Sequence, residues 1–159
     1  MSTYELLLYL HILGVFGLIA AAGISTAVGI RTGFVREPRV IATLLDLQHR
    51  TEWFVTLPAG ALTVIAGSLL VDEAGYEYSA DWVETAYALF IVVLALDFFG
   101  LLRRNRRLRA QAQTLIDRGT PESDDLRRAA GAPIGIVMGA LLDISFLVFL
   151  YLMVAKPGN

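Results

Sequence analysis

The chain has 159 residues, enough for one domain, and 56% of them are hydrophobic, with a mean hydropathy of +0.61. The formal net charge is −2, no nucleic-acid module is visible, and the absence of cysteine excludes disulfides, iron–sulfur clusters, thiolate metal sites and cysteine nucleophiles. Long uncharged stretches alternate with short charged ones, as in membrane proteins, because a charge at the bilayer centre costs at least about 2.5 kcal/mol. We therefore expect residues 1–159 to form a single membrane domain, an all-α antiparallel bundle of four transmembrane helices.

The first predicted span, residues 6–30, contains no acidic residue, lysine or arginine. It is too long for the apolar part of a signal peptide, and no basic residue precedes it, so we expect it to be retained. The second span, residues 53–71, follows an amphipathic helix that can begin at Pro38. Pro58 lies inside this span and is expected to kink it, because proline removes a backbone hydrogen bond.

The third predicted span covers residues 82–102, after a short acidic connection. Its helix is expected to continue beyond the membrane to about Ile116, and the breakers in residues 119–121 end it. Ser123 can cap the next helix, which leads into a fourth span at residues 130–154.

The arginines predict the topology. Of the thirteen Lys and Arg residues, four lie between the first and second spans, eight between the third and fourth, and none between the second and third. The positive-inside rule therefore places both basic connections in the cytoplasm and both termini outside. The densest cluster directly follows the third span and includes Arg103, Arg104, Arg106 and Arg107. We expect it to contact the headgroups of anionic lipids, where each charge contributes about 1 kcal/mol.

Three glycines and one acid recur at every fourth position of the fourth span: Gly131, Gly135, Gly139 and Asp143. Glycines at this spacing let another helix approach closely. Packing within the bundle is the favoured interpretation, and contact with a second copy or a partner membrane protein is the alternative. Asp143 lies near the middle of the membrane, so we expect its carboxyl group to be protonated, paired or facing water.

Asp97 is the second acidic residue inside a predicted span. It lies six residues before Arg103, which places it about 9 Å from the end of that span. Arg104 shares its helical face, so we expect the carboxylate and the guanidinium to pair. The alternative is that Asp97 binds a proton or a cation.

Two histidines fall in different settings. His11 lies in the first span, where it either donates a hydrogen bond to a neighbouring carbonyl or hydroxyl or binds a cofactor. His49 lies with Arg50 and Glu52 near the inner edge of the membrane, where we expect a solvated interfacial network. The span directions separate the two histidines by about 20 Å along the membrane normal, too far for one haem iron.

Four segments carry a family resemblance: residues 10–14 (Leu-His-Ile-Leu-Gly), Leu57-Pro58 with Ala66-Gly67, Arg103–Leu108 and Leu152–Pro157. In combination they look most like a family of predicted bacterial integral membrane proteins of unknown function. The chain also distantly resembles the copper-resistance D proteins and the J-type membrane-bound protoporphyrinogen oxidases. The resemblance covers nearly the whole chain and implies a multi-pass protein of the bacterial plasma (inner) membrane.

The resemblance also implies where a cofactor would bind. In the oxidases, haem-linked chemistry relies on a first-span histidine, which His11 matches, and on an intramembrane lysine, whereas this chain has no lysine before Lys156. Copper transport requires methionine, histidine or cysteine ligands, and Met138 and Met153 lie too far apart along the fourth span to share a site. The resemblance therefore points to a tentative haem b at His11 rather than to copper.

Two functions are consistent with the sequence, which contains no Ser/His/Asp arrangement, phosphate loop or zincin motif. The favoured one is a non-enzymatic helical-bundle module that self-associates or serves a partner complex. The alternative is a haem-binding redox protein or a small proton- or ion-coupled transporter with a site at His11. Asp143 and Asp97 are the further candidate residues of this cofactor or ion site, and no metal ligands are assigned.

Overall fold

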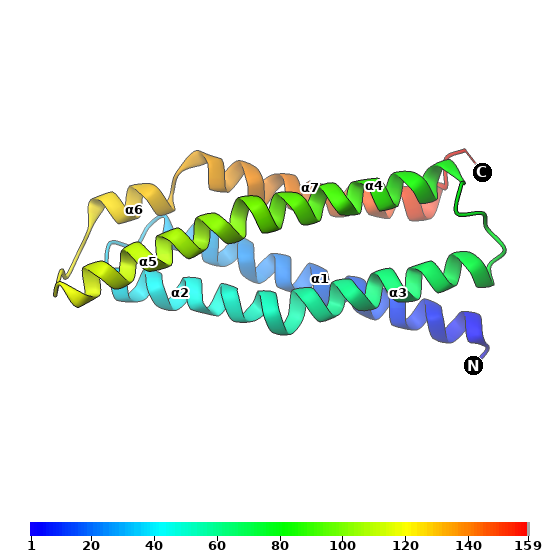
Figure 1. Ribbon diagram of the computed structural model, residues 1–159, viewed down its shortest axis with the longest axis horizontal. Coiled ribbons are helices and arrows are strands. Elements are labelled where there is room, and N and C mark those ends of the chain that lie inside the picture. The colour runs from blue at the N-terminus through cyan, green and yellow to red at the C-terminus, as the bar shows by residue number, and fades with distance from the viewer. Residues whose placement is uncertain (159) are drawn as a thin grey trace.

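The computed structural model describes residues 1–158 and contains four long apolar helical rods, each able to cross a membrane by its length and composition (Figure 1). No strand occurs among these residues, so the predicted all-α fold is confirmed. In chain order the rods are α1 (Thr3–Thr32); α2 (Pro38–Thr51), η1 (Glu52–Thr56) and α3 (Leu57–Glu73); α4 (Asp81–Ala95), η2 (Leu96–Leu102) and α5 (Arg103–Asp117); and α6 (Asp124–Ala130) with α7 (Pro133–Ala155). The segments η1 and η2 are π-helical and continue directly into α-helices on both sides.

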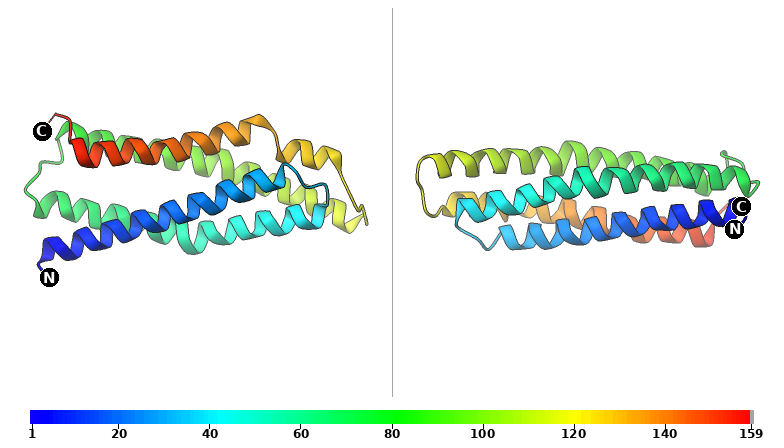
Figure 2. Two further views of the ribbon diagram at one scale, coloured as in Figure 1. Left: turned by 180° about the vertical axis from the view of Figure 1, so that it is seen from behind. Right: turned by 90° about the horizontal axis from the view of Figure 1, so that it is seen from below.

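The rods run antiparallel, and both chain termini lie at the same end of the molecule (Figure 2). We name this the terminal end. The opposite end carries α2, α5 and α6 together with the two basic connections, and we name it the arginine end.

Local sequence signals set the helix ends. Ser2 and Glu5 form a reciprocal capping box at the start of α1. As predicted, Ser123 caps α6, and its hydroxyl accepts a hydrogen bond of 3.2 Å from the backbone N–H of Leu126. Gly119 follows α5 with a φ of +70°, a left-handed conformation that glycine adopts without strain.

The fourth rod is interrupted where the sequence suggested a continuous span from residue 130. α6 ends at Ala130, and α7 begins only at Pro133. Proline disfavours a helical conformation at the residue before it, and Ala132 is accordingly extended, with a ψ of 137°. The break separates a short helix at the arginine end from the long apolar helix α7.

The main hydrophobic core lies at the arginine end. It joins α2, α5, α6 and the turn after α1, and comprises Val35, Ile41, Leu45, Leu108, Ala112, Leu126 and Ala130. Ile41 and Ala112 are completely buried. By contrast, only 6% to 17% of the most apolar window of each rod is buried within the chain. The rods are therefore joined to one another by the core at the arginine end. Most of their apolar side chains are exposed on the surface, where lipid can cover them.

Within the apolar region the rods pack mainly as two pairs, α1 with α3 and α4 with α7 (Figure 2). At the terminal end, α3 and α4 are joined by a small cluster of Val71, Trp82 and Val83. The hydroxyl of Tyr87 in α4 also lies 2.6 Å from that of Ser68 in α3. These links hold the two pairs together at the end opposite the main core.

Two of the three glycines in the fourth rod make close contacts within the chain. A Cβ on Gly131 would lie 3.2 Å from the Cα of Gly33, and a Cβ on Gly135 would lie 2.6 Å from the guanidinium carbon of Arg104. Gly139 differs, because nothing lies within 4 Å of a Cβ placed there. Close backbone approach therefore depends on glycine at Gly131, whereas Gly135 makes room for the Arg104 side chain and Gly139 makes neither contact.

We expect Gly131→Leu to destabilise the protein in detergent by about 1–3 kcal/mol, because the new side chain would overlap the backbone of Gly33. Gly139→Leu is the matched control and should have little effect, since open space surrounds that position. Thermal unfolding followed by circular dichroism measures both variants. Equal unfolding midpoints would contradict the packing of the fourth rod against α1.

Candidate functional site

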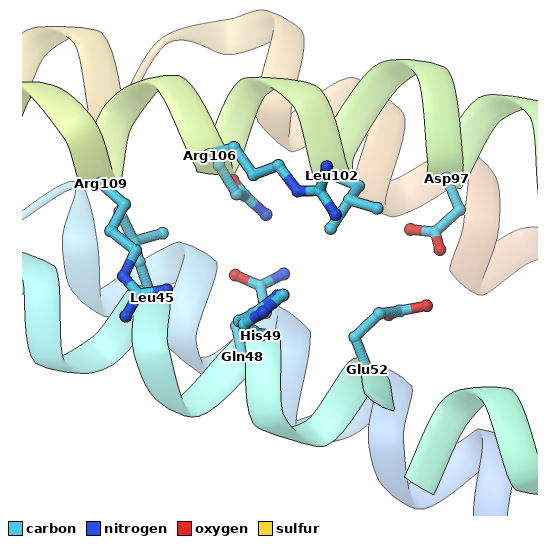
Figure 3. A pocket seen from close by; sticks show the side chains of 9 residues that line it. Leu45, Gln48, His49, Glu52, Asp97, Leu102, Arg106 and Arg109 are labelled. Atoms are coloured by element: carbon cyan, nitrogen blue, oxygen red, sulfur yellow. The ribbon is translucent and has the colours of Figure 1, made fainter. Parts of the chain in front are cut away.

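The two π-helical segments lie opposite each other on neighbouring rods, and each carries an acid: Glu52 opens η1, and Asp97 is the second residue of η2 (Figure 3). Pro58 follows η1 and donates no backbone hydrogen bond to the preceding turn, which accounts for the altered winding there. η2 contains Gly100, where a Cβ would lie 3.1 Å from the sulfur of Met138 in α7. Single π-helical turns inside α-helices frequently mark functional sites.

A cavity of about 180 Å³ separates these two rods, and we name it the carboxylate cavity (Figure 3). The wall on α2 and η1 is formed by Leu45, Gln48, His49 and Glu52. The opposite wall, on η2 and α5, is formed by Asp97, Leu102, Asn105, Arg106 and Arg109. Seven of these nine residues are polar or charged, so the cavity can hold water.

Glu52 and Asp97 point toward each other across the inner end of the carboxylate cavity (Figure 3). Among residues 1–158, neither carboxylate forms an ion pair with a lysine or arginine. Asp97 lies about 9 Å inside the apolar stretch, counted from Arg103, and Glu52 faces it at the same depth. Acids at this depth are costly unless they are neutral, paired or in contact with water.

The pairing of Asp97 with Arg104 that the sequence suggested does not occur. The guanidinium of Arg104 turns toward α6 and donates hydrogen bonds to the carbonyls of Ala129 and Ala130, at 2.9 and 2.6 Å. These carbonyls end α6 and lack a helical partner, so Arg104 caps that helix. Arg104 is consequently directed into the protein rather than at lipid headgroups, and Asp97 is left to face Glu52.

At the outer end of the cavity, an ion-pair cluster ties the two walls together. Asp46 of α2 binds Arg109 of α5 at 2.5 Å and Arg50 of its own helix at 2.9 Å. The hydrogen bond from Arg50, aided by the charge of Arg109, holds the pKa of Asp46 below its usual value. The spacing of α2 and α5 is thus set by this cluster and by the hydrophobic core beside it.

His49 lies inside the carboxylate cavity, three residues before Glu52. Its ring contacts Trp53 edge-on, with 6.3 Å between the ring centroids. The expected interfacial network of His49, Arg50 and Glu52 is not formed, because Arg50 binds Asp46 instead. His49 and Glu52 therefore share the cavity without Arg50.

His11 forms a hydrogen bond that joins the first rod to the second, far from the carboxylate cavity. Its Nδ1 lies 2.8 Å from the carbonyl oxygen of Thr63, and a Cβ on Gly67 would lie 2.8 Å from the same nitrogen. Thr63 follows His49 by 14 residues, about 21 Å along the rod, so one iron cannot bind both histidines. The carbonyl holds Nδ1 and Gly67 makes room for the ring, so His11 links α1 to α3 by a hydrogen bond.

Asp143 accepts a hydrogen bond of 3.0 Å from the hydroxyl of Thr26, which joins the fourth rod to the first. Neither Asp143 nor His11 lines the cavity that contains Asp97, so these three sequence-predicted residues do not form one site. In the described part of the chain, no group of three or more His, Asp or Glu side chains is placed to hold a metal ion.

The remaining arginines of the predicted lipid-binding cluster differ in their surroundings. Arg103 and Arg107 are exposed, and the guanidinium of Arg103 lies 5.9 Å from the ring centroid of Phe99. Arg106 is exposed as well, and it also lines the carboxylate cavity and extends along it (Figure 3). Contact with lipid headgroups therefore stays a prediction, and it suits Arg103 and Arg107 best.

Sequence reasoning missed Glu52 as the residue opposite Asp97, and it missed Gln48 and Asn105 as further polar residues of the cavity. The positions of the two acids in the sequence could have indicated that they lie close together. Glu52 and Asp97 each lie close to the arginine end of consecutive spans. Because consecutive spans are antiparallel neighbours, positions near the same end are brought to the same depth.

A family model described as "Predicted integral membrane protein (DUF2269)" matches residues 5–157, which is nearly the whole chain. No curated protein and no solved structure matches. The family description gives a membrane location and no reaction, ligand or partner. The resemblance to copper-resistance D proteins and to J-type oxidases stays a prediction.

We expect His11→Ala to lower the stability of the protein in detergent by about 1 kcal/mol, because the hydrogen bond between α1 and α3 is lost. His11→Asn keeps a short donor at this position and should lose less. The visible spectrum of the purified protein should show no Soret band. A Soret band that disappears in His11→Ala would overturn the structural role of this residue.

Proposed function

We propose that this chain, which belongs to the DUF2269 family of predicted integral membrane proteins, is a non-enzymatic four-helix module. In this proposal the module binds and releases a proton inside the membrane. Glu52 and Asp97 share this proton. In this proposal the carboxylate cavity connects the two acids to water at the arginine end, where its lining residues Arg106 and Arg109 are exposed. The proposal concerns a site other than the one at His11 that the sequence suggested.

One observation carries the proposal. Two carboxyl groups from different rods point toward each other in the apolar region, and no lysine or arginine of residues 1–158 pairs with either (Figure 3). Two facing carboxylates repel each other, whereas a pair that shares one proton forms a hydrogen bond. Ionisable groups inside a membrane protein are expensive to keep, which is why they mark functional sites more often than structural ones.

The space for water in the carboxylate cavity supports the proposal, because a chain of water molecules can conduct a proton. The cavity of about 180 Å³ has room for about six water molecules at about 30 Å³ each. The amides of Gln48 and Asn105 and the guanidinium of Arg106 can bind such waters. A proton can therefore move between the acids and the arginine end without passing through lipid.

We also propose that the membrane is a bacterial plasma membrane and that the arginine end faces the cytoplasm. The distribution of positive charge supports this orientation, because the connection between α3 and α4 at the terminal end contains no Lys or Arg. The proton site then exchanges with the cytoplasm.

A second proposed property is self-association, or contact with a partner membrane protein. It is favoured by Gly139, which leaves open space on α7 where another helix can approach closely. Large apolar side chains are also exposed on α7 and α1, including Ile136 at 66% and Phe16 at 67% exposure. Lipid covers these positions if no partner does.

Infrared spectra of the purified protein test the shared proton. We expect a carboxylic acid C=O band at neutral pH that shifts or disappears in Glu52→Gln and in Asp97→Asn, because each variant leaves one carboxyl group where two shared a proton. Glu122→Gln changes an exposed acid between α5 and α6 and should leave the band unchanged. A wild-type protein that shows only ionised carboxylates at neutral pH would refute the proposed function.

The absence of native cysteine makes the orientation testable with single cysteines. Ser79→Cys places a thiol between α3 and α4, and Glu122→Cys places one between α5 and α6, both at exposed positions. We expect a membrane-impermeant maleimide to label Ser79→Cys in cells with an intact plasma membrane, and Glu122→Cys only after permeabilisation. The opposite labelling pattern would show that the arginine end faces outward.

A further inference from the structure

Building on the proposed function, we propose that His49 carries the proton between water at the arginine end and the Glu52–Asp97 pair. The inference assigns a role to a side chain of the carboxylate cavity that neither pairs with an acid nor contributes to the hydrophobic core. It rests on the position of the ring, on the chemistry of the other lining residues and on the freedom of the ring to turn.

The position of His49 is intermediate along the cavity. Figure 3 shows Leu45 and Arg109 at the outer end, Glu52 and Asp97 at the inner end, and His49 between them. His49 precedes Glu52 by three residues, so the two side chains share a helical face and are offset by about 4.5 Å along the axis. A single water can bridge such an offset.

The chemistry of the cavity singles out the imidazole. A proton carrier must accept and donate near neutral pH, which is the property of histidine. The amides of Gln48 and Asn105 bind water but do not take up a proton, and the guanidinium groups of Arg106 and Arg109 stay protonated. His49 is therefore the lining residue that can exchange a proton with both water and a carboxylate.

The other acidic side chains around His49 bind other partners, so its ring is free to exchange a proton with Glu52 and Asp97. Besides the Glu52–Asp97 pair, the charged side chains on the elements packed around the cavity include Arg106 and Arg109 of α5, Asp46 and Arg50 of α2, Arg31 of α1 and Asp143 of α7. Asp46 is occupied by its two arginine partners, and Asp143 accepts from the hydroxyl of Thr26. Within residues 1–158, Glu52 and Asp97 are thus the acids toward which a proton on His49 can pass.

The ring contact of His49 permits the movement that a carrier needs. Its aromatic contact with Trp53 is T-shaped, and within residues 1–158 no hydrogen bond holds the ring in one orientation. Uptake proceeds when a hydronium ion donates a proton to one ring nitrogen and becomes water, while the proton on the other nitrogen passes to the pair of ionised carboxylates, which then share it. The ring then returns to its first tautomer by turning or by exchange through water, so protons balance over one cycle.

The experiment measures the rate of protonation separately from its equilibrium. The detergent solution of the full-length protein is first brought to a pH at which the band is absent. A caged proton is then photolysed, and the rise of the carboxylic acid band is followed by time-resolved infrared spectroscopy. We expect His49→Ala to slow the rise of the band about 100-fold, within the range for general acid–base groups. Imidazole in the buffer should restore the rate, and the equilibrium titration of the band should stay close to that of the wild type.

His11→Ala provides the matched control, because it removes the other histidine from a site outside the cavity and should leave the rate unchanged. His49→Gln keeps the size and polarity of the side chain, so a slow rate in this variant points to lost proton exchange rather than lost folding. A normal band with an unchanged rate in both His49 variants would overturn the role of His49 alone. A wild-type protein without the band would overturn the proposed function together with this inference.

Discussion

Lipid cannot solvate a charge or satisfy a backbone N–H or C=O group, and this constraint shapes the whole molecule. The backbone responds by forming four long apolar helical rods, and most charged side chains lie beyond the ends of the apolar region. Glu52, Asp97 and Asp143 are the exceptions. Asp143 is satisfied by the hydroxyl of Thr26. The other two face each other across a polar cavity, which is an arrangement that lipid would penalise unless water and a proton were part of it.

The arrangement of the acids depends on packing outside the apolar region. Ile41 and Ala112 are completely buried in a core that clamps α2 to α5, and the ion pair between Asp46 and Arg109 fixes the same two helices. α2 continues directly into η1, and α5 directly follows η2. The packing of α2 against α5 therefore sets the distance between η1 and η2. Arg104 contributes indirectly, because it caps α6 and thereby leaves Asp97 without a cation.

Histidine has two different uses in this protein. His11 is bound to a backbone carbonyl and packed against Gly67, which ties α1 to α3. His49 lies in a polar cavity and contacts the edge of Trp53. Sequence position alone favoured His11 as the functional residue, because it is the one inside the hydrocarbon. The tertiary structure instead favours His49 for proton transfer, because His49 lines the cavity that contains Glu52 and Asp97 and His11 does not.

Hydropathy and periodicity were sufficient for the four rods, the continuation of the third rod to Asp117 and the cap at Ser123, because each depends on neighbours in the chain. Glu52 and Asp97 face each other although they are 45 residues apart in the sequence, so their contact depends on how two rods pack. It also depends on Arg104, which binds the end of α6 instead of Asp97. The use of Gly131 and Gly135, but not Gly139, inside the chain likewise depends on which helix lies opposite. Such pairings follow from the relative depth and rotation of the helices. These are set by long-range packing, and no local pattern encodes them.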